Sequence, residues 1–331
     1  MNIREQDLAA IVELGYTPEE AWFLYVVATH SGYFQPRQVV AANGPACDKS
    51  AQRLTEKLKR RGQVAWREYQ GTGGVYHLLS KTIYSRIGKT DSRSRLRHSG
   101  EYIRTRLLLL DFVLEHPQYD YFETETDKLA YFCERRGIPK EILPVRTYPS
   151  ASGAPPTCRY FVDKFPLFLD TSSPVPVVTL SYIDPGQAGL GGFPHHLRRY
   201  RELFSWLGDF AFLYVSDSSA HLSRAEKCFE SLVKRGARDA AAKDVCLYFE
   251  RRKAWEQKQY ARFSTEDLEA LQNAKERYAS TELERLYASW TSSEIDDSRV
   301  QRTLGHKFCS VKIEFRTWLA RQKKQGLARS S

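Results

Sequence analysis

The sequence predicts an α+β protein of several domains, and three observations support this prediction. The chain has 331 residues, more than one domain usually contains, and 42% of them are hydrophobic, enough to supply a core for each part. It begins with three helical segments followed by a β-hairpin pattern. Helical and strand-like segments then mix as far as residue 250, and the remaining residues have helical patterns with mixed charge.

The N-terminal helices are marked by their capping residues. Thr17 is a favourable N-cap, Pro18 suits the first helical position, and Glu20 completes a capping box before the apolar run AWFLYVVA. Glycine-containing turns predict the ends of a short second helix over residues 35–41 and a third helix over residues 48–61, capped by its first residue.

The third predicted helix has two different faces. The first face is apolar, has the spacing of an inward-facing stripe, and comprises Cys47, Ala51, Leu54 and Leu58. The second face is polar and basic and comprises Lys49, Ser50, Arg53, Lys57 and Arg60. After this helix, VAWREY and VYHLL flank a glycine-rich turn at residues 70–74, which predicts a β-hairpin.

This order of three helices and a hairpin resembles the winged helix-turn-helix domains of bacterial transcriptional regulators. We therefore expect a DNA-binding domain over residues 1–92. The resemblance implies that the third helix enters the major groove of double-stranded DNA and that the hairpin contacts the backbone or the minor groove. The implied DNA-contacting residues are Lys49, Ser50, Gln52, Arg53, Lys57, Arg60, Arg67 and Thr72.

The positive charge of the chain is local. Residues 48–106 contain fifteen Lys and Arg against five Asp and Glu, an excess equal to the net charge of +10 of the whole chain. Such an excess favours a nucleic-acid partner. Residues 93–106 form a basic linker and the start of a helix, and we expect Arg93, Arg95 and Arg97 to be either a solvated connection or an arm along DNA phosphates.

The central region, residues 107–250, is predicted to be an α/β domain. A helix precedes three strand-like segments, and then come a helix, a strand and a helix; the strands are LPVRTY, CRYFVDKFPLFLD, VPVVTLSYID and DFAFLYVS. This order resembles the restriction-endonuclease-like fold. The run from CRYFVDKF through FPHHLRRYRELF to FAFLYVS is similar to the replication-relaxation family of mobile elements.

Catalytic residues of such a nuclease are incomplete in this sequence. The resemblance implies an acid on the second strand and an acid-x-Lys triplet on the third, which together hold Mg²⁺ and activate water. Asp163 or Asp170 fits the first position. The third strand ends at Asp184 and contains no acid-x-Lys triplet. We therefore expect no nuclease activity, no catalytic residues, no metal and no cofactor.

Other motifs do not indicate a catalytic or metal site. His195 and His196 are adjacent and point apart on a helix, and the glycine-rich residues 186–192 match no full phosphate-binding motif. The six cysteines form no C-x-x-C pair, which is typical of reduced thiols. Because no apolar run reaches the length of a membrane span and the first ten residues are charged, we expect a cytoplasmic protein.

Residues 251–331 are predicted to form a C-terminal helical region. Its strongest pattern is an apolar stripe with the spacing 4, 4, 3, 4, 3, which predicts one face of a long helix: Val300, Leu304, Phe308, Val311, Phe315 and Trp318. This stripe either packs on the central domain or, through its last five members, forms a homodimer interface.

Together, these patterns favour a sequence-specific transcriptional regulator. We expect a repressor of bacterial or mobile-element origin that binds an inverted-repeat operator in double-stranded DNA as a homodimer. Two alternatives stay open. One is a plasmid replication-relaxation protein or DNA nuclease, and the other is an adaptor whose winged helix binds a protein.

Overall fold

The chain forms a mixed α+β structure with several sheets. The computed structural model describes residues 1, 3–44, 48–69, 72–149, 155–163, 165–172, 174–186, 189–300, 303 and 312–320. Two compact units result: the first contains residues 1–196, residues 209–226 and the chain from residue 314 on, and the second contains residues 197–208 and 227–313. None of the helices in these described ranges has the length and apolar character needed to cross a bilayer.

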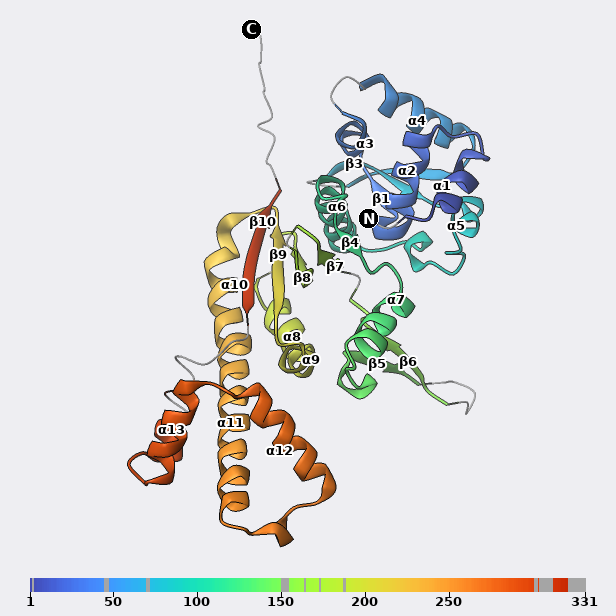
Figure 1. The fold of residues 1–331 in the computed structure, drawn as a ribbon. Helices are drawn as coiled ribbons and strands as arrows, with labels where there is room; N and C mark the ends of the chain where they lie inside the picture. Colours follow the sequence, from blue (N-terminus) through green and yellow to red (C-terminus); the bar gives the residue numbers. More distant parts are fainter. Residues whose placement is uncertain are drawn as a thin grey trace. The chain divides into compact units, whose positions relative to one another are not determined.

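The first unit begins with helices around a three-stranded sheet (Figure 1). These elements are α1 (Glu5–Val12), α2 (Pro18–Val26), the π-helical turn η1 (Val27–Ser31), β1 (Tyr33–Phe34), α3 (Pro36–Asn43), α4 (Asp48–Arg60), β2 (Val64–Tyr69), β3 (Gly73–Leu78), α5 (Lys81–Arg86) and the 3₁₀ turn η3 (Arg93–Arg95). The strand order is β1-β3-β2 and both pairs are antiparallel. The strand β2 is therefore at the edge of this sheet.

The predicted start of α2 is confirmed. The Thr17 hydroxyl accepts a hydrogen bond from the Glu20 N–H (3.3 Å), and the Glu20 carboxylate accepts one from the Thr17 N–H (3.0 Å). The apolar face of α4 is confirmed as well, because Ala51, Leu54 and Leu58 are buried. Cys47, the other member of that face, lies outside the described residues.

Both faces of the small sheet are covered. On one face Phe34 and Tyr76 stack (5.3 Å between ring centroids) within the core formed by α1 to α4. On the other face Tyr33 and Val75 pack with Ile103 of the next helix, α6 (Gly100–Glu115). Residues on β2 therefore alternate between the α4 side and the α6 side of the hairpin.

The second part of the first unit is built on a five-stranded sheet with the order β10-β9-β8-β7-β4. Its strands are β4 (Asp120–Tyr121), β7 (Leu167–Asp170), β8 (Val177–Asp184), β9 (Phe210–Ser216) and β10 (Ile313–Leu319). β7 is antiparallel to β4 and β8, and β8 is parallel to β9. Around them lie α7 (Glu125–Leu129), η4 (Ala130–Arg135), η5 (Lys140–Ile142), α8 (Gly192–Arg199) and the separate hairpin β5 (Val145–Tyr148) and β6 (Thr157–Tyr160).

Two of the central strands differ from the prediction. LPVRTY is predicted as the first strand of the central domain, but its strand, β5, pairs with β6 in a separate two-stranded sheet, and the first strand of the main sheet along the chain is β4. CRYFVDKFPLFLD was expected to be one strand, but it divides into β6 and β7. The division is explained by Phe161, whose φ of 49° is incompatible with an extended strand, and by Pro166, which has no N–H to donate.

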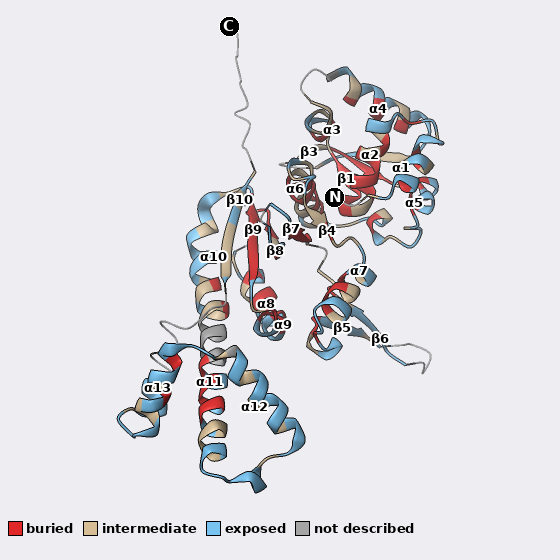
Figure 2. Cartoon of the chain, viewed as in Figure 1, coloured by how far each residue is buried: buried red, intermediate tan, exposed pale blue. Residues whose placement is uncertain are grey.

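The main sheet lies between helices. Phe112 of α6 packs against Phe168 of β7 (5.8 Å between ring centroids), and Phe193 at the start of α8 packs against Phe212 of β9 (5.8 Å). Figure 2 shows β9 buried along its length, as its continuous apolar sequence predicts for a central strand. The result is an arrangement of helix, sheet and helix.

The predicted long C-terminal helix is wrong for its last part, because residues 313–319 form strand β10 beside β9. A separation of three residues puts Phe315 and Trp318 on one helix face but on opposite faces of a strand. Phe315 packs near Phe212 and Tyr214 of β9, whereas Trp318 packs on Phe112 (5.5 Å). Leu304, Phe308 and Val311 lie outside the described residues.

The second unit is helical in its described part. It contains α9 (Arg201–Leu207), the end of α10 (Leu222–Phe229), the π-helical turn η7 (Glu230–Lys234), α11 (Arg235–Glu256), η8 (Tyr260–Arg262), α12 (Thr265–Arg277) and α13 (Thr281–Thr291). The start of α10 and the short turn η6 (Ser219–His221) before it belong to the first unit. Phe249 of α11 packs on Tyr287 and Trp290 of α13. Val300, the first member of the predicted stripe, is buried in this core.

Candidate functional site

The exposed face of α4 is the first candidate site. Opposite its buried face lie six exposed polar side chains, Lys49, Gln52, Arg53, Glu56, Lys59 and Arg60. Among the described residues, Lys49, Arg53 and Arg60 form no ion pair or hydrogen bond. Among the side chains of this face that the structure describes, the one acid, Glu56, accepts a hydrogen bond from Gln52 (2.9 Å). The face therefore offers three unpaired cations to an anionic partner, while Ser50 beside it is partly buried.

Lys57 has a different place from the other predicted DNA contacts. Its ammonium group donates to the Glu20 carboxylate of α2 (2.6 Å) and lies over the Tyr16 ring (4.5 Å from the centroid). Only 20% of its side chain is exposed. In this structure Lys57 holds α4 against α2 and is not part of the exposed basic face.

The remaining predicted DNA contacts of this domain, Arg67 and Thr72, lie in the hairpin. The register pairs Trp66 with Tyr76 and Arg67 with Val75, so Trp66 is on the α4 side and Arg67 is on the α6 side. Thr72 is fixed through its carbonyl oxygen, which accepts a hydrogen bond from the Gln35 side chain (2.7 Å). Arg67 is thus not adjacent to the basic face of α4.

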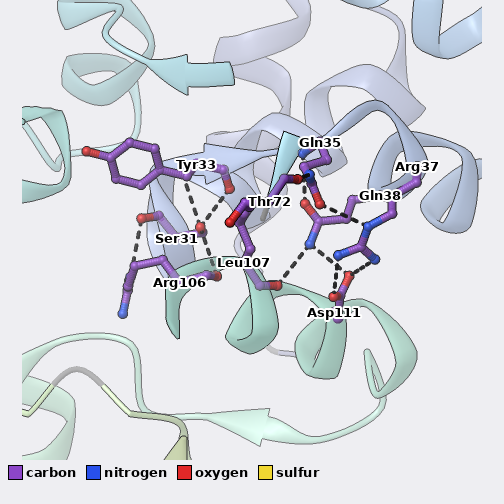
Figure 3. A network of polar contacts seen from close by, with 9 residues as sticks. All are labelled: Ser31, Tyr33, Gln35, Arg37, Gln38, Thr72, Arg106, Leu107 and Asp111. Carbon is purple, nitrogen blue, oxygen red and sulfur yellow. Dashed lines mark hydrogen bonds and ion pairs between the residues drawn. The ribbon is translucent and has the colours of Figure 1, made fainter. Parts of the chain in front are cut away.

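A polar network ties α3 and the hairpin turn to α6 (Figure 3). Gln38, which is fully buried, donates to the Leu107 carbonyl (2.9 Å) and to the Asp111 carboxylate (2.8 Å). Arg37 forms a bidentate pair with the same carboxylate, with both distances 2.8 Å. These contacts give the hairpin and α3 a fixed position relative to α6.

A buried arginine completes this network at the end of η1. The Arg106 guanidinium donates to the carbonyl oxygens of His30 and Ser31, and the Ser31 hydroxyl donates to the Arg106 carbonyl (3.0 Å). A cation at the carbonyl end of a helix satisfies groups that otherwise have no partner. Sequence reasoning missed this role, because an arginine within the basic segment gave no sign of being buried.

The predicted basic arm is packed on the sheet. Residues 93–95 form η3, and the buried Ser94 offers its carbonyl oxygen to the His77 ring (2.8 Å). Arg95 donates to the carbonyl oxygens of Leu79 and Thr90 (both 3.3 Å). The backbone of this segment is therefore not a free, extended arm, because it already has partners in the protein. Arg93 and Arg97 remain exposed.

Acidic and histidine side chains gather at the carboxyl ends of β8 and β9. Asp184 accepts hydrogen bonds from the Tyr214 hydroxyl and the Gly186 N–H (2.9 Å), and the His221 ring lies 3.1 Å from it. Asp163 pairs with the buried His196 (3.1 Å) at the same end, whereas His195 is exposed. As predicted, the two histidines point apart.

Asp170 lies at the opposite end of the sheet. It pairs with Val177, the first residue of β8, and its carboxylate binds Arg316 of β10 (2.6 Å). Asp170 and Asp184 therefore do not share a site. Among the described residues, no group of three or more His, Cys, Asp or Glu side chains is arranged to hold a metal ion. The glycine-rich loop falls partly outside the described residues, at 187 and 188.

A further polar cluster surrounds Glu123, which no sequence motif marked. Its carboxylate accepts hydrogen bonds from Tyr25 (2.7 Å) and Lys89 (2.8 Å), and the His30 ring lies 3.8 Å away. A cleft of about 810 Å³ opens here, lined also by Tyr131. Burial lowers the pKa of His30 well below its ordinary value, and nearby cations including Lys89 act in the same direction.

Comparisons with protein families, with curated proteins and with solved structures found no match to this chain.

Proposed function

We propose that the protein is a sequence-specific regulator of transcription that binds double-stranded DNA through α4. The observation that supports this most is the exposed basic face of α4, where Lys49, Arg53 and Arg60 have no partner among the described residues. Unpaired cations on an exposed helix are suited to the phosphates and base edges of a major groove.

The surroundings of α4 support a winged helix-turn-helix domain as the element that carries it. Helices α2, α3 and α4 precede the hairpin of β2 and β3, which is the order expected from the resemblance. Lys57 and its partner Glu20 hold α4 against α2, so that the basic face has a fixed position. A rigid support lowers the entropic cost of binding.

For the central sheet we propose a structural role without nuclease chemistry. The order of its elements, with a helix, three strands, a helix and a strand, is compatible with a restriction-endonuclease-like fold. Of the two candidates for the first acid, Asp170 lies at the opposite end of the sheet from Asp184 and binds Arg316, whereas Asp163 lies at the same end as Asp184 and pairs with His196. Asp184 itself is bound by the Tyr214 hydroxyl. Metal-dependent nicking of supercoiled DNA that disappears in Asp184→Ala would overturn this proposal.

A mobility-shift assay on duplexes selected from a random pool tests DNA binding. The double variant Arg53→Ala with Arg60→Ala should bind the best duplex at least tenfold more weakly. Because two phosphate or base contacts are lost, the slope of log affinity against log salt concentration should fall by about 2. Arg224→Ala with Arg285→Ala removes two exposed arginines from other helices and serves as the matched control.

Unchanged binding in the α4 variant, with unchanged binding in the control, would show that α4 is not the reading element. If the wild-type protein binds no duplex but captures a protein, the adaptor function replaces the regulator. We also propose a cytoplasmic location, as expected for a regulator of bacterial or mobile-element DNA.

We further propose a homodimer that reads an inverted repeat, with half-sites about 10 base pairs or a multiple apart. Phe315 and Trp318 do not support this interface, because both pack against the protein's own chain. Light scattering after size-exclusion chromatography, with and without operator DNA, tests the assembly. A protein that stays monomeric on an inverted repeat would contradict it.

A further inference from the structure

Trp66 is a large apolar side chain that the DNA-binding residues named so far do not include. It lies on the edge strand β2 and is 51% exposed. Its cross-strand partner is Tyr76, and the ammonium group of Lys59 in α4 lies 5.2 Å from the centroid of the Tyr76 ring. The indole therefore lies on the α4 side of the hairpin, next to the basic helix.

The indole has a defined position on the hairpin. It covers Gly74, where a Cβ atom would lie 2.8 Å from the indole Nε1. Only glycine leaves room for the ring at this point. Thr72, just before β3, is also held in place, because its carbonyl oxygen accepts a hydrogen bond from the Gln35 side chain (2.7 Å). Because the ring is already positioned, little conformational entropy is lost when a partner stacks on it.

The α6 side of the same edge strand is basic. Arg67 lies on this side, which also contains His77. Burial lowers the pKa of His77, and the nearby charges of Arg67 and Arg97 act in the same direction. Both guanidinium groups are exposed, and neither forms an ion pair or hydrogen bond within the described part of the chain. The edge of the hairpin thus has an exposed ring on one face and unpaired arginines on the other.

We propose that Trp66 stacks on an unpaired base where a duplex opens into single strands, so that the protein prefers DNA with such a junction. The inference rests on the proposed function, because α4 must hold the duplex part. Inside a closed duplex both faces of each base are covered by its neighbours, and an indole meets only their edges. The last base before a junction exposes one face, on which the indole can stack. One of the two single strands beyond the junction then passes around β2 toward Arg67 and Arg97, which bind its phosphates.

Base–aromatic stacking contributes about 1–3 kcal/mol, which is roughly a 5- to 150-fold preference for the junction. Fluorescence anisotropy with two labelled probes measures it: a blunt duplex, and the same duplex ending in two single-stranded extensions. Trp66→Ala should lose the preference and bind both probes like the wild-type protein binds the blunt one. Trp66→Phe, which keeps a ring, should retain part of it.

Trp206→Ala is the matched control, since Trp206 is 53% exposed but lies in the second unit. It should keep the full preference. Arg67→Ala with Arg97→Ala should weaken binding of the forked probe while leaving the blunt duplex unchanged. Equal affinity of the wild-type protein for both probes overturns the proposal, and so does equal weakening of both by Trp66→Ala, which would mean a contact to the duplex backbone.

The proposed function is tested separately by the double variant of Arg53 and Arg60 on the blunt duplex. If that variant loses binding while Trp66→Ala changes nothing, the regulator function stands and the junction proposal fails. If neither probe binds to the wild-type protein, both fail. Unchanged circular dichroism of Trp66→Phe and Trp66→Ala verifies that the variants are folded.

Discussion

Gln38→Ala should destabilise the first unit far more than Arg37→Ala, although both side chains bind the same Asp111 carboxylate (Figure 3). Gln38 is fully buried, and it also donates to the Leu107 carbonyl (2.9 Å) and accepts from the Gln35 N–H (2.9 Å). Arg37 has an exposed side chain (52%) and has water as an alternative partner.

The magnitudes follow from these environments. A hydrogen bond to a charged group contributes about 1.5–3 kcal/mol and a neutral one about 1 kcal/mol. Gln38→Ala removes three hydrogen bonds, and alanine restores a small part of the loss through its higher helix propensity. The free energy of unfolding should therefore fall by about 3 kcal/mol. An exposed ion pair such as that of Arg37 is worth at most about 1 kcal/mol.

Urea unfolding followed by tryptophan fluorescence measures the difference. With a denaturant slope of about 2–3 kcal/mol per M, Gln38→Ala should lower the midpoint of the first unit by about 1 M, and Arg37→Ala by less than about 0.5 M. Equal shifts for the two variants would refute the reasoning, because burial would then not determine the strength of these bonds.

Three further predictions concern the first unit. Gly32→Ala should lower the urea midpoint more than Gly62→Ala. Both glycines have a positive φ, but a Cβ atom on Gly32 would lie 2.7 Å from the Ser94 carbonyl oxygen, whereas a Cβ atom on Gly62 would have no neighbour within 4 Å. Equal losses for the two variants would contradict this prediction. His30 has a lowered pKa in the folded state, so below its ordinary pKa of 6.5 the unfolded chain binds the extra proton, and up to about 1.4 kcal/mol of stability should be lost per pH unit. Unfolding between pH 7 and pH 5 measures this loss, and His30→Gln should reduce it. Phe315→Ala should lower the midpoint without changing the mass measured by light scattering; a change from dimer to monomer would mean that the ring contacts a partner.

Much of the local structure could be predicted from the sequence, because it depends on neighbours along the chain. The capping residues Thr17 and Glu20 define the start of α2, and the spacing of Ala51, Leu54 and Leu58 identifies the buried face of α4. The basic side chains opposite that face were recognised for the same reason.

Where the prediction failed, contacts between distant segments decided the outcome. Lys57 and Arg53 are equally basic and lie one turn apart, but only Lys57 meets an acid, Glu20, on another helix. The spacing of Phe315 and Trp318 fits a helix, yet the free edge of β9 provides backbone partners that make this segment a strand. No pattern within residues 313–319 indicates that the edge of β9 will lie beside them.

The sequence by itself determined the N-terminal helices, the hairpin that follows them and where the positive charge is concentrated, since caps, turns and periodicity act over a few residues. Only the tertiary structure decided which cations are exposed and on which side of the hairpin they lie. Trp66 and Arg67 are neighbours in the chain, but the pleat of β2 puts them on opposite faces, and the packing of α4 and α6 on those faces gives each a different environment.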